Sequence, residues 1–252
     1  MMTKDSSATQ AAHTYRAHID GLRAVAVLSV MLFHAHGAWL PGGFVGVDIF
    51  FVISGFLITR NIVSDIAAGR FTLHEFYRRR IKRIAPMMFV VVAATLVAST
   101  LVMTPEDAQA VAKSAFWSVA SLANVHFWRS LDGGYFANSS AEVPLLHLWS
   151  LGVEEQFYFV WPLLLLWSAS LRRPLLLVLV AVAALGSFEL ASSLFASDPS
   201  FVYYMLPTRM GELLIGSVLG LWIAGQPPPP PPEAHEHLLR WRSAPPWPRG
   251  LA

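Results

Sequence analysis

Two adjacent apolar runs joined by a short turn constrain this chain more than any other feature. They cover Leu22 to Trp39 and Phe44 to Thr59, and a Pro-Gly-Gly turn at 41–43 separates them. An α-helix rises 1.5 Å per residue, so each run is long enough to cross the hydrocarbon core of a bilayer. The stretch from 20 to 59 therefore predicts a transmembrane hairpin whose turn lies outside the cell.

Composition extends this prediction to the whole chain. The sequence is 55% hydrophobic and only 13% charged, with a mean hydropathy of +0.50, whereas a soluble domain would expose more charge. Between Arg60 and Arg83 it carries seven Lys or Arg and two Asp or Glu, which predicts a cytoplasmic loop by the positive-inside rule. No cysteine is present, which excludes disulfides and thiolate metal sites.

We expect an all-α polytopic membrane protein with six to seven transmembrane helices and a cytoplasmic Arg-rich loop. Glu75 to Ile84 mixes aromatic and basic residues, which predicts an interfacial helix. Pro86 follows, and a third span is predicted over 84–103. Later spans are predicted at about 148–168, 174–194 and 201–224.

The segment 110–128 leaves two alternatives. It is apolar on average but contains Lys113, His126 and several small polar residues. A full span here would leave Arg172 and Arg173 outside the cell. We favour an outer loop over 104–147, with 110–128 re-entrant or interfacial, because both basic clusters then stay cytoplasmic. The alternative is a seventh span.

Three regions divide the chain. Residues 1–19 form a polar, cytoplasmic N-terminal tail that leads into an uncleaved first helix, with Asp20 as a candidate N-cap. Residues 20–225 form the transmembrane domain. In 226–252, Gln226 precedes six prolines, which predicts an extended or disordered tail.

The first candidate site lies on the hairpin. Arg23 and His34 are eleven residues apart, so they share a helix face but stand about 16 Å apart and would contact different parts of a long ligand. His34 and Asp48 flank the turn at similar distances, so the Asp48 carboxylate could hold one imidazole nitrogen and leave the other as a general base. Alternatively Arg23 snorkels, His34 only packs, and Asp48 bonds a backbone or Ser group on its own helix. His36 faces elsewhere and is expected to be structural.

A second polar patch runs from His147 to Tyr158. Two adjacent carboxylates, Glu154 and Glu155, would repel each other in a membrane helix unless they line a cavity or find donors. We expect Glu154 and Glu155 to lie at a depth in the membrane near that of His34. The alternative is a structural network of hydrogen bonds with Arg209.

Basic and small residues supply the remaining features. The run from Arg78 to Arg83 is a candidate phosphate site, because guanidinium groups bind phosphate oxygens bidentately. Such a cluster can also simply set topology and contact anionic lipid. Arg209 and Glu212 are spaced to pair along one helix. Gly216 and Gly220 form a small-xxx-small pattern that favours helix packing.

Together these motifs resemble the membrane acyltransferase 3 family of bacterial O-acyltransferases. The resemblance covers residues 15–225 and rests on several long motifs in order. They are His18-Ile-Asp-Gly-Leu-Arg23 with His34, the stretch from Gly42 through Asp48 and Ser54 to Leu57, Arg78 to Pro86, His147 to Tyr158, and Arg209-Met-Gly-Glu212.

The resemblance implies transfer of an acyl group, usually acetyl, from cytoplasmic acyl-CoA to a hydroxyl of a cell-envelope polysaccharide or lipid-linked sugar. Acyl-CoA would be a co-substrate, with no bound cofactor, no metal and no nucleic-acid partner. His34 would act as base only or carry the acyl group covalently. The candidate roles are as follows: catalytic His34, Asp48 and Glu154; donor-binding Arg23, Arg79, Arg80 and Arg83; and, in an acceptor or structural network, Ser54, His147, Ser150, Glu155, Tyr158, Arg209 and Glu212.

The family also implies features that this chain lacks. Its core has about ten spans, often followed by an extracytoplasmic hydrolase-like domain, whereas six or seven spans and a polyproline run are visible here. The expected location is the bacterial cytoplasmic membrane, with the N-terminus cytoplasmic. Two other functions remain open: a proton-coupled transporter or flippase whose buried His, Asp and Glu form a relay, and an inactive, truncated acyltransferase remnant.

Overall fold

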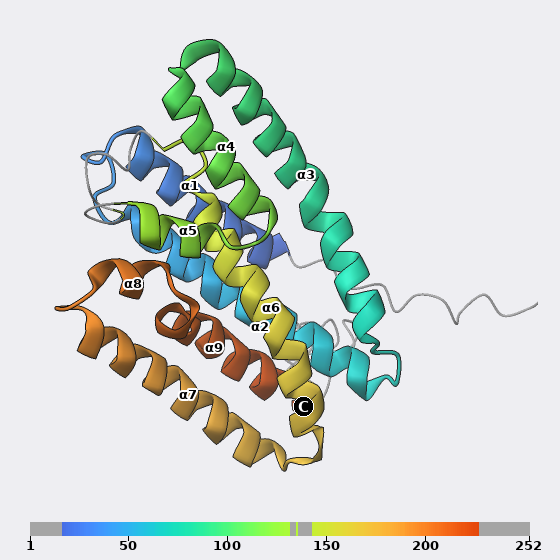
Figure 1. Cartoon of the computed structure of the whole chain (residues 1–252). Coiled ribbons are helices and arrows are strands. Elements are labelled where there is room, and N and C mark those ends of the chain that lie inside the picture. The colour runs from blue at the N-terminus through green and yellow to red at the C-terminus, as the bar shows by residue number, and fades with distance from the viewer. Residues whose placement is uncertain (1–16, 132–134, 136–142, 227–252) are drawn as a thin grey trace, which may run out of the picture.

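The computed structural model describes residues 17–131, 135 and 143–226, and the described part is built from helices (Figure 1). The expected all-α membrane fold is confirmed. The predicted terminal tails lie almost wholly outside the described residues. In chain order the elements are α1 (Ala17–Ala35), η1 (Gly43–Val45), α2 (Gly46–Ala67), α3 (Leu73–Val102), α4 (Pro105–Val119), α5 (Ala123–Ser130), α6 (Leu148–Trp167), η3 (Ser168–Ser170), α7 (Arg173–Leu194), α8 (Pro199–Tyr204) and α9 (Leu206–Ile223).

Four segments of the described chain are long and apolar enough to cross a membrane. They are His18–Ala35, Gly43–Ala67, Leu73–Val102 and Arg173–Leu194. Helices α6 and α9, which were also expected to span, carry charged residues in or near their N-terminal halves and do not meet the same criterion. The chain is a multi-pass membrane protein, and the exact number of spans stays a prediction.

The hairpin at the start of the chain is confirmed, with one change at its beginning. Helix α1 starts at Ala17, so Asp20 lies in the first turn and the N-cap prediction was wrong. A carboxylate in the first turn still interacts favourably with the helix dipole. After the turn, α2 continues to Ala67, well beyond the predicted end at Thr59, because the apolar pattern persists into the polar loop.

The interfacial helix and the third span were expected as two consecutive segments, and the structure joins them. The interfacial segment and the third span form one helix, α3, with Pro86 inside it. Thr72 caps this helix by accepting a hydrogen bond from the Glu75 backbone N–H at 3.3 Å. Proline removes one backbone hydrogen bond, and membrane helices tolerate this loss where local adjustments satisfy the freed carbonyl.

The ambiguous segment forms two short helices instead of a span. Helix α4 has 15 residues and is about 22 Å long, which is shorter than the hydrocarbon core. It folds back beside the C-terminal end of α3, and α5 turns away from it toward α8 (Figure 1). A non-spanning 110–128 segment therefore agrees with the interpretation that we favoured.

The predicted single span over 201–224 was wrong, because it contains a break. Met205 has an extended backbone between α8 and α9, and Pro207 stands at the start of α9. Thr208 Oγ1 donates to the carbonyls of Met205 and Val202 at 2.9 and 3.0 Å, which satisfies backbone groups freed at the break.

Helix α9 lies between α2 and α7 and forms the centre of the bundle (Figure 1). A side chain on Gly55 of α2 would meet the carbonyl of Leu213, and one on Gly216 of α9 would meet the carbonyl of Val52. The backbones therefore touch only because these positions lack a Cβ atom. The packing role predicted for Gly216 and Gly220 is confirmed.

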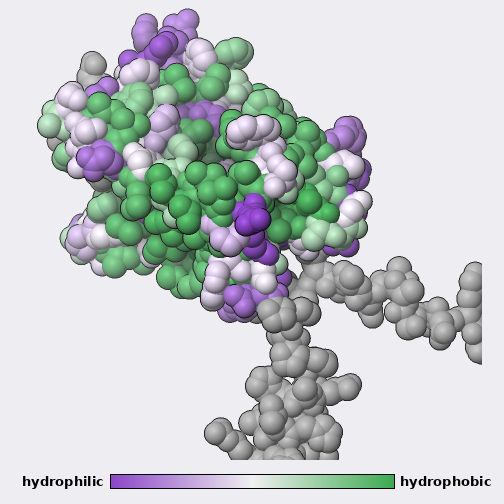
Figure 2. Space-filling view, turned by 90° about the horizontal axis from the view of Figure 1, so that it is seen from below, coloured by the Kyte–Doolittle hydropathy of each residue, from purple (hydrophilic) through white to green (hydrophobic). Residues whose placement is uncertain are grey.

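Hydrogen bonds join the same helices where the backbones are close. Thr59 Oγ1 donates to Ser217 Oγ at 2.9 Å and accepts from Trp161 Nε1 at 2.7 Å, so α2, α6 and α9 share one buried polar cluster. Away from this core the apolar side chains face outward, and Figure 2 shows a broad hydrophobic face with hydrophilic residues at its edges. Such a surface suits lipid contact.

We predict that Gly216→Leu destabilises the protein while Gly186→Leu does not. Overpacking typically costs about 1–3 kcal/mol, and here the obstacle is backbone of α2, which cannot rotate away. Gly186 lies on α7 with no atom within 4 Å of an added Cβ, so it is a matched control in an apolar helix. Thermal unfolding of the detergent-solubilised protein measures the effect. Equal midpoints for the two variants would contradict this description of the core.

Candidate functional site

A cavity of about 1000 Å³ lies against α1, the start of α2 and the segment that leads into α6. Its wall runs from Ala26 to His34 on α1, a distance of about 12 Å along the helix axis, and continues to Gly37 just after the helix. His34, His147 and Ser150 line it together, so three of the predicted site residues meet here. Tyr135 lines the same cavity.

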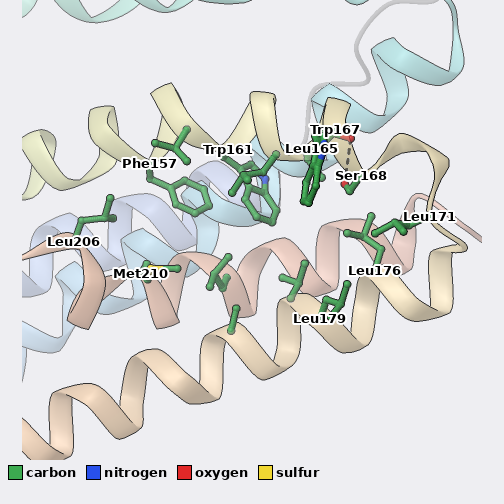
Figure 3. A pocket seen from close by; sticks show the side chains of 15 residues that line it. Phe157, Trp161, Leu165, Trp167, Ser168, Leu171, Leu176, Leu179, Leu206 and Met210 are labelled. Carbon is green, nitrogen blue, oxygen red and sulfur yellow. Dashed lines mark hydrogen bonds between the residues drawn. The ribbon is translucent and has the colours of Figure 1, made fainter.

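A second cavity, of about 240 Å³, lies between α6, α7 and α9 (Figure 3). Its walls are apolar side chains such as Phe157, Leu179 and Met210, and the Ser168 hydroxyl is turned to the carbonyl of Leu165 at 3.2 Å. Such a surface offers neither a base nor a charge. The candidate site is therefore the larger cavity.

The imidazole of His34 is held at both ring nitrogens. Nδ1 lies 2.8 Å from the carbonyl oxygen of Val30, one helical turn earlier. Because a carbonyl can only accept, Nδ1 carries the proton, and Nε2 of the neutral ring keeps its lone pair. Nε2 accepts from the Tyr135 hydroxyl at 2.7 Å. The basic nitrogen of His34 therefore already binds a hydroxyl group at the wall of the cavity.

The predicted contact between His34 and Asp48 was wrong. The Asp48 carboxylate pairs with Arg209 of α9, and Arg209 also pairs with Glu212 at 3.1 Å. The Val30 carbonyl of α1 accepts the hydrogen bond from His34 Nδ1 that we expected Asp48 to accept. The predicted pair of Arg209 and Glu212 is confirmed.

The similar depth expected for His34 and Asp48 was also wrong. Gly46 of α2 packs against Ala26 and Val30 of α1, so Asp48 lies about two helical turns deeper than His34, and its side chain is turned toward α9.

The carboxylate of Glu154 lies at the other end of the site. It is buried, and its neighbours are Ser54, Arg80 and Arg23. Arg23 is three turns of α1 away from His34, so the expected depth of Glu154 near His34 was wrong. The alternative, a network of Glu154 and Glu155 with Arg209, is not what the structure shows, since Arg209 bonds Asp48 and Glu212 instead.

The basic loop divides into paired and unpaired arginines. Arg78 makes two hydrogen bonds to Glu75, and Arg79 makes an ion pair with Asp65 at 3.1 Å. In the described part of the chain, no carboxylate oxygen lies within 4.0 Å of the guanidinium nitrogens of three further residues: Arg23, Arg80 and Arg83.

Two of these three guanidinium groups rest on aromatic rings. Arg80 lies 4.0 Å from the centre of the Tyr158 ring, and Arg23 lies 5.1 Å from that of Phe50. A guanidinium group on a ring keeps its N–H donors available at its edge. These arginines could therefore bind an anionic ligand.

One face of α6 connects the two ends. His147, Ser150, Glu154 and Tyr158 are spaced by three, four and four residues, which places them in one stripe about 16 Å long. His147 lies near His34, and Glu154 lies near Arg23. The stripe on α6 thus runs antiparallel to the Arg23–His34 face of α1. The site has a basic end and a histidine end.

Sequence reasoning missed the aromatic cluster behind His34. Tyr135 stacks on Tyr203 with ring centres 4.3 Å apart, and Trp149 packs against both. Burial raises the pKa of Tyr135, which keeps its hydroxyl protonated as a donor to His34. Tyr135 stands in a stretch without periodicity, so no sequence signal indicated its position.

Comparisons with known proteins identify the family of this chain. A family described as "Acyltransferase domain" matches residues 16–244. The chain is 34% identical over 230 residues to O-acetyltransferase OatA of Staphylococcus aureus, covering 88% of this chain and 38% of that protein. It is 36% identical over 218 residues to peptidoglycan O-acetyltransferase OatA of Listeria monocytogenes, covering 84% and 34%. The chain therefore spans about a third of the length of these relatives. No solved structure matches it.

We predict that Tyr135→Phe makes His34 more reactive toward diethyl pyrocarbonate. The reagent needs the free lone pair of Nε2, and loss of a hydrogen bond of about 1 kcal/mol corresponds to about a fivefold rate increase. Peptide mapping by mass spectrometry gives the rate at each histidine, with His36, which packs on Trp39, as the internal reference. An unchanged rate at His34 would show that Tyr135 does not occupy Nε2.

Proposed function

The chain belongs to the acyltransferase domain family, and from this premise we propose that it transfers an acyl group from acyl-CoA to a hydroxyl of a cell-envelope glycan. The observation that carries the proposal is the position of His34. Its Nε2 lies at the wall of a cavity that extends along α1 to Ala26, one helical turn from Arg23. Among the described residues, Arg23, Arg80 and Arg83 have no carboxylate oxygen within 4.0 Å. A transferase of this kind needs both features, a base and an anion site, at opposite ends of the donor.

The donor would bind at the basic end. Arg80, Arg83 and Arg23 would contact its phosphates, because guanidinium groups form strong charge-assisted hydrogen bonds with phosphate oxygens. Its long flexible arm would then follow α1 and present the thioester at His34. Arg79 is less available for this role, since its guanidinium group already pairs with Asp65.

The acceptor would be a hydroxyl of an envelope polysaccharide or lipid-linked sugar that reaches the cavity from the outer side. The L. monocytogenes relative is described as acting on peptidoglycan, so peptidoglycan is the first acceptor to test, with acetyl as the first acyl group. We place the protein in the bacterial cytoplasmic membrane with its N-terminus and Arg-rich loop in the cytoplasm.

The proposed chemistry uses His34 as a general base. The acceptor hydroxyl replaces the Tyr135 hydroxyl at Nε2. Nε2 then takes the proton of the acceptor hydroxyl, and the acceptor oxygen attacks the thioester carbonyl carbon. The C–S bond then breaks, and the imidazolium returns the proton to the departing sulfur. The hydrogen bond from Nδ1 to Val30 keeps Nε2 as the basic atom throughout. An acyl group trapped on His34 after acid quenching would show a covalent step instead.

We predict that membranes containing the protein transfer label from radiolabelled acetyl-CoA to envelope glycans, and that His34→Ala removes at least 99% of this transfer. General-base catalysis typically contributes a factor of about 10² or more. His36→Ala is the matched control and keeps the rate within about twofold, because His36 packs on Trp39 and does not line the cavity.

Two results would contradict the proposal. Transfer unchanged by His34→Ala would remove His34 from the mechanism. Absence of transfer by the inserted wild-type protein would fit a remnant, and also a proton-coupled transporter, which has no use for acetyl-CoA.

We also predict that Arg80→Ala and Arg83→Ala each raise the KM for acetyl-CoA by roughly tenfold, with kcat little changed. Loss of a charge-assisted hydrogen bond of about 1.5–3 kcal/mol gives this size of effect. Arg78→Ala is the control, because Arg78 is held by Glu75 at the protein surface. Steady-state kinetics with varied donor concentration measures the three variants. A larger effect at Arg78 than at Arg80 would place the donor elsewhere.

A further inference from the structure

Arg209 occupies an unusual position near the start of α9. Its guanidinium group pairs with Asp48 of α2 and with Glu212 of its own helix, and its side chain is only 15% exposed. Three aromatic rings surround it: those of Phe51, Trp149 and Tyr203 have their centres 5.7, 5.8 and 5.5 Å from its central carbon. Arg209 is thus held between two carboxylates and a cage of rings.

This arrangement is a poor way to stabilise a fold. Arg209 Nε and Glu212 Oε2 are buried without a hydrogen-bond partner in the described structure. Buried ion clusters that leave such groups unsatisfied are often no more stable than apolar side chains in their place. Ionisable groups inside a membrane domain are therefore candidates for a functional role.

The cage leads directly to His34. Tyr203, one of the three rings, stacks on Tyr135 at 4.3 Å, and Trp149 packs on Tyr203 and also meets Tyr135 edge-on. The Tyr135 hydroxyl then donates to His34 Nε2 at 2.7 Å. Every step from Arg209 to the imidazole is a contact between packed groups.

We propose that Arg209 is a positioning residue that sets the orientation of His34 through Tyr203 and Tyr135, and that Asp48 acts on His34 only by holding Arg209. The proposal rests on the acyl transfer proposed above. It gives Asp48 a role in the reaction without the direct contact that the sequence suggested. The planar guanidinium group is needed because it can pair with two carboxylates and stack on a ring together, which an ammonium group cannot do.

The test compares Arg209→Lys, Tyr135→Phe and the double variant. Arg209→Lys is expected to lower kcat by about tenfold or more, since small misplacements of a catalytic group cost this much. The KM for acetyl-CoA is expected to stay within about twofold, because Arg23 lies about 16 Å along α1 from His34 and the other proposed donor arginines lie near Arg23. In the Tyr135→Phe background, Arg209→Lys is expected to lower kcat by less than about twofold further, since the two act through one contact.

Arg173→Lys is the matched control. Arg173 is a second part-buried arginine, at the start of α7, and its Nε donates to the carbonyl of Leu221 near the C-terminal end of α9 at 3.0 Å. It contacts no part of the cavity wall. We expect Arg173→Lys to lower the thermal midpoint but to leave kcat of the folded protein unchanged, alone and combined with Tyr135→Phe. This comparison separates positioning from general stability.

A second readout does not need turnover. If Arg209 positions Tyr135, then Arg209→Lys and Asp48→Asn raise the rate of His34 modification by diethyl pyrocarbonate, as Tyr135→Phe does, and adding either to Tyr135→Phe changes nothing further. The proposal would be overturned if the kcat losses of the two single variants multiplied in the double variant. It would also be overturned if Arg209→Lys raised KM with kcat unchanged, or left the rate of His34 modification unaltered. Wild-type protein that transfers no acetyl group would refute the proposed function, while the His34 rates would still decide the positioning of the imidazole.

Discussion

The close contact of α2 and α9 is the interaction on which the rest of the structure depends. Gly55 and Gly216 let the two backbones touch, and the hydrogen bonds of Thr59 and Ser217 fix their register. With this register set, Asp48 near the start of α2 lies opposite Arg209 near the start of α9. The α9 side of the site is therefore a consequence of helix packing. A bulkier residue in the contact would displace charged groups as well as apolar ones.

The site combines a cavity beside His34 with a group of arginines toward the other end of α1. His34 lies in the cavity wall, whereas Arg23 and Arg80 rest on aromatic rings beyond it. Helices α1 and α6 run antiparallel between these two regions, each with polar residues about 16 Å apart. This separation suits a long ligand with an anionic head and a reactive tip. Family membership and the positions of His34 and the arginines therefore support the same proposal.

The hairpin shows how far the sequence alone could lead. Periodicity predicted that Arg23 and His34 share one face of α1. Turn symmetry predicted similar depths for His34 and Asp48, but the packing of Gly46 on Ala26 and Val30 places Asp48 deeper. The direction of each side chain was beyond these arguments. His34 needed only the Val30 carbonyl of its own helix to fix its protonated nitrogen, whereas Asp48 found a stronger, charged partner in Arg209. Tyr135 carried no signal, because a tyrosine in a non-periodic stretch has no defined partner until the chain folds.

The sequence by itself determined the class of protein, most helix positions, the small-residue contact in α9 and the family. These features follow from local patterns: apolar runs long enough for a bilayer, glycines at four-residue spacing, and basic residues in one loop. Only the tertiary structure decided which charged groups pair, that α3 continues through Pro86, and that α8 and α9 are separate helices. In a low-dielectric interior a charge is stabilised by the nearest opposite charge in space, and helix packing alone decides which residue that is.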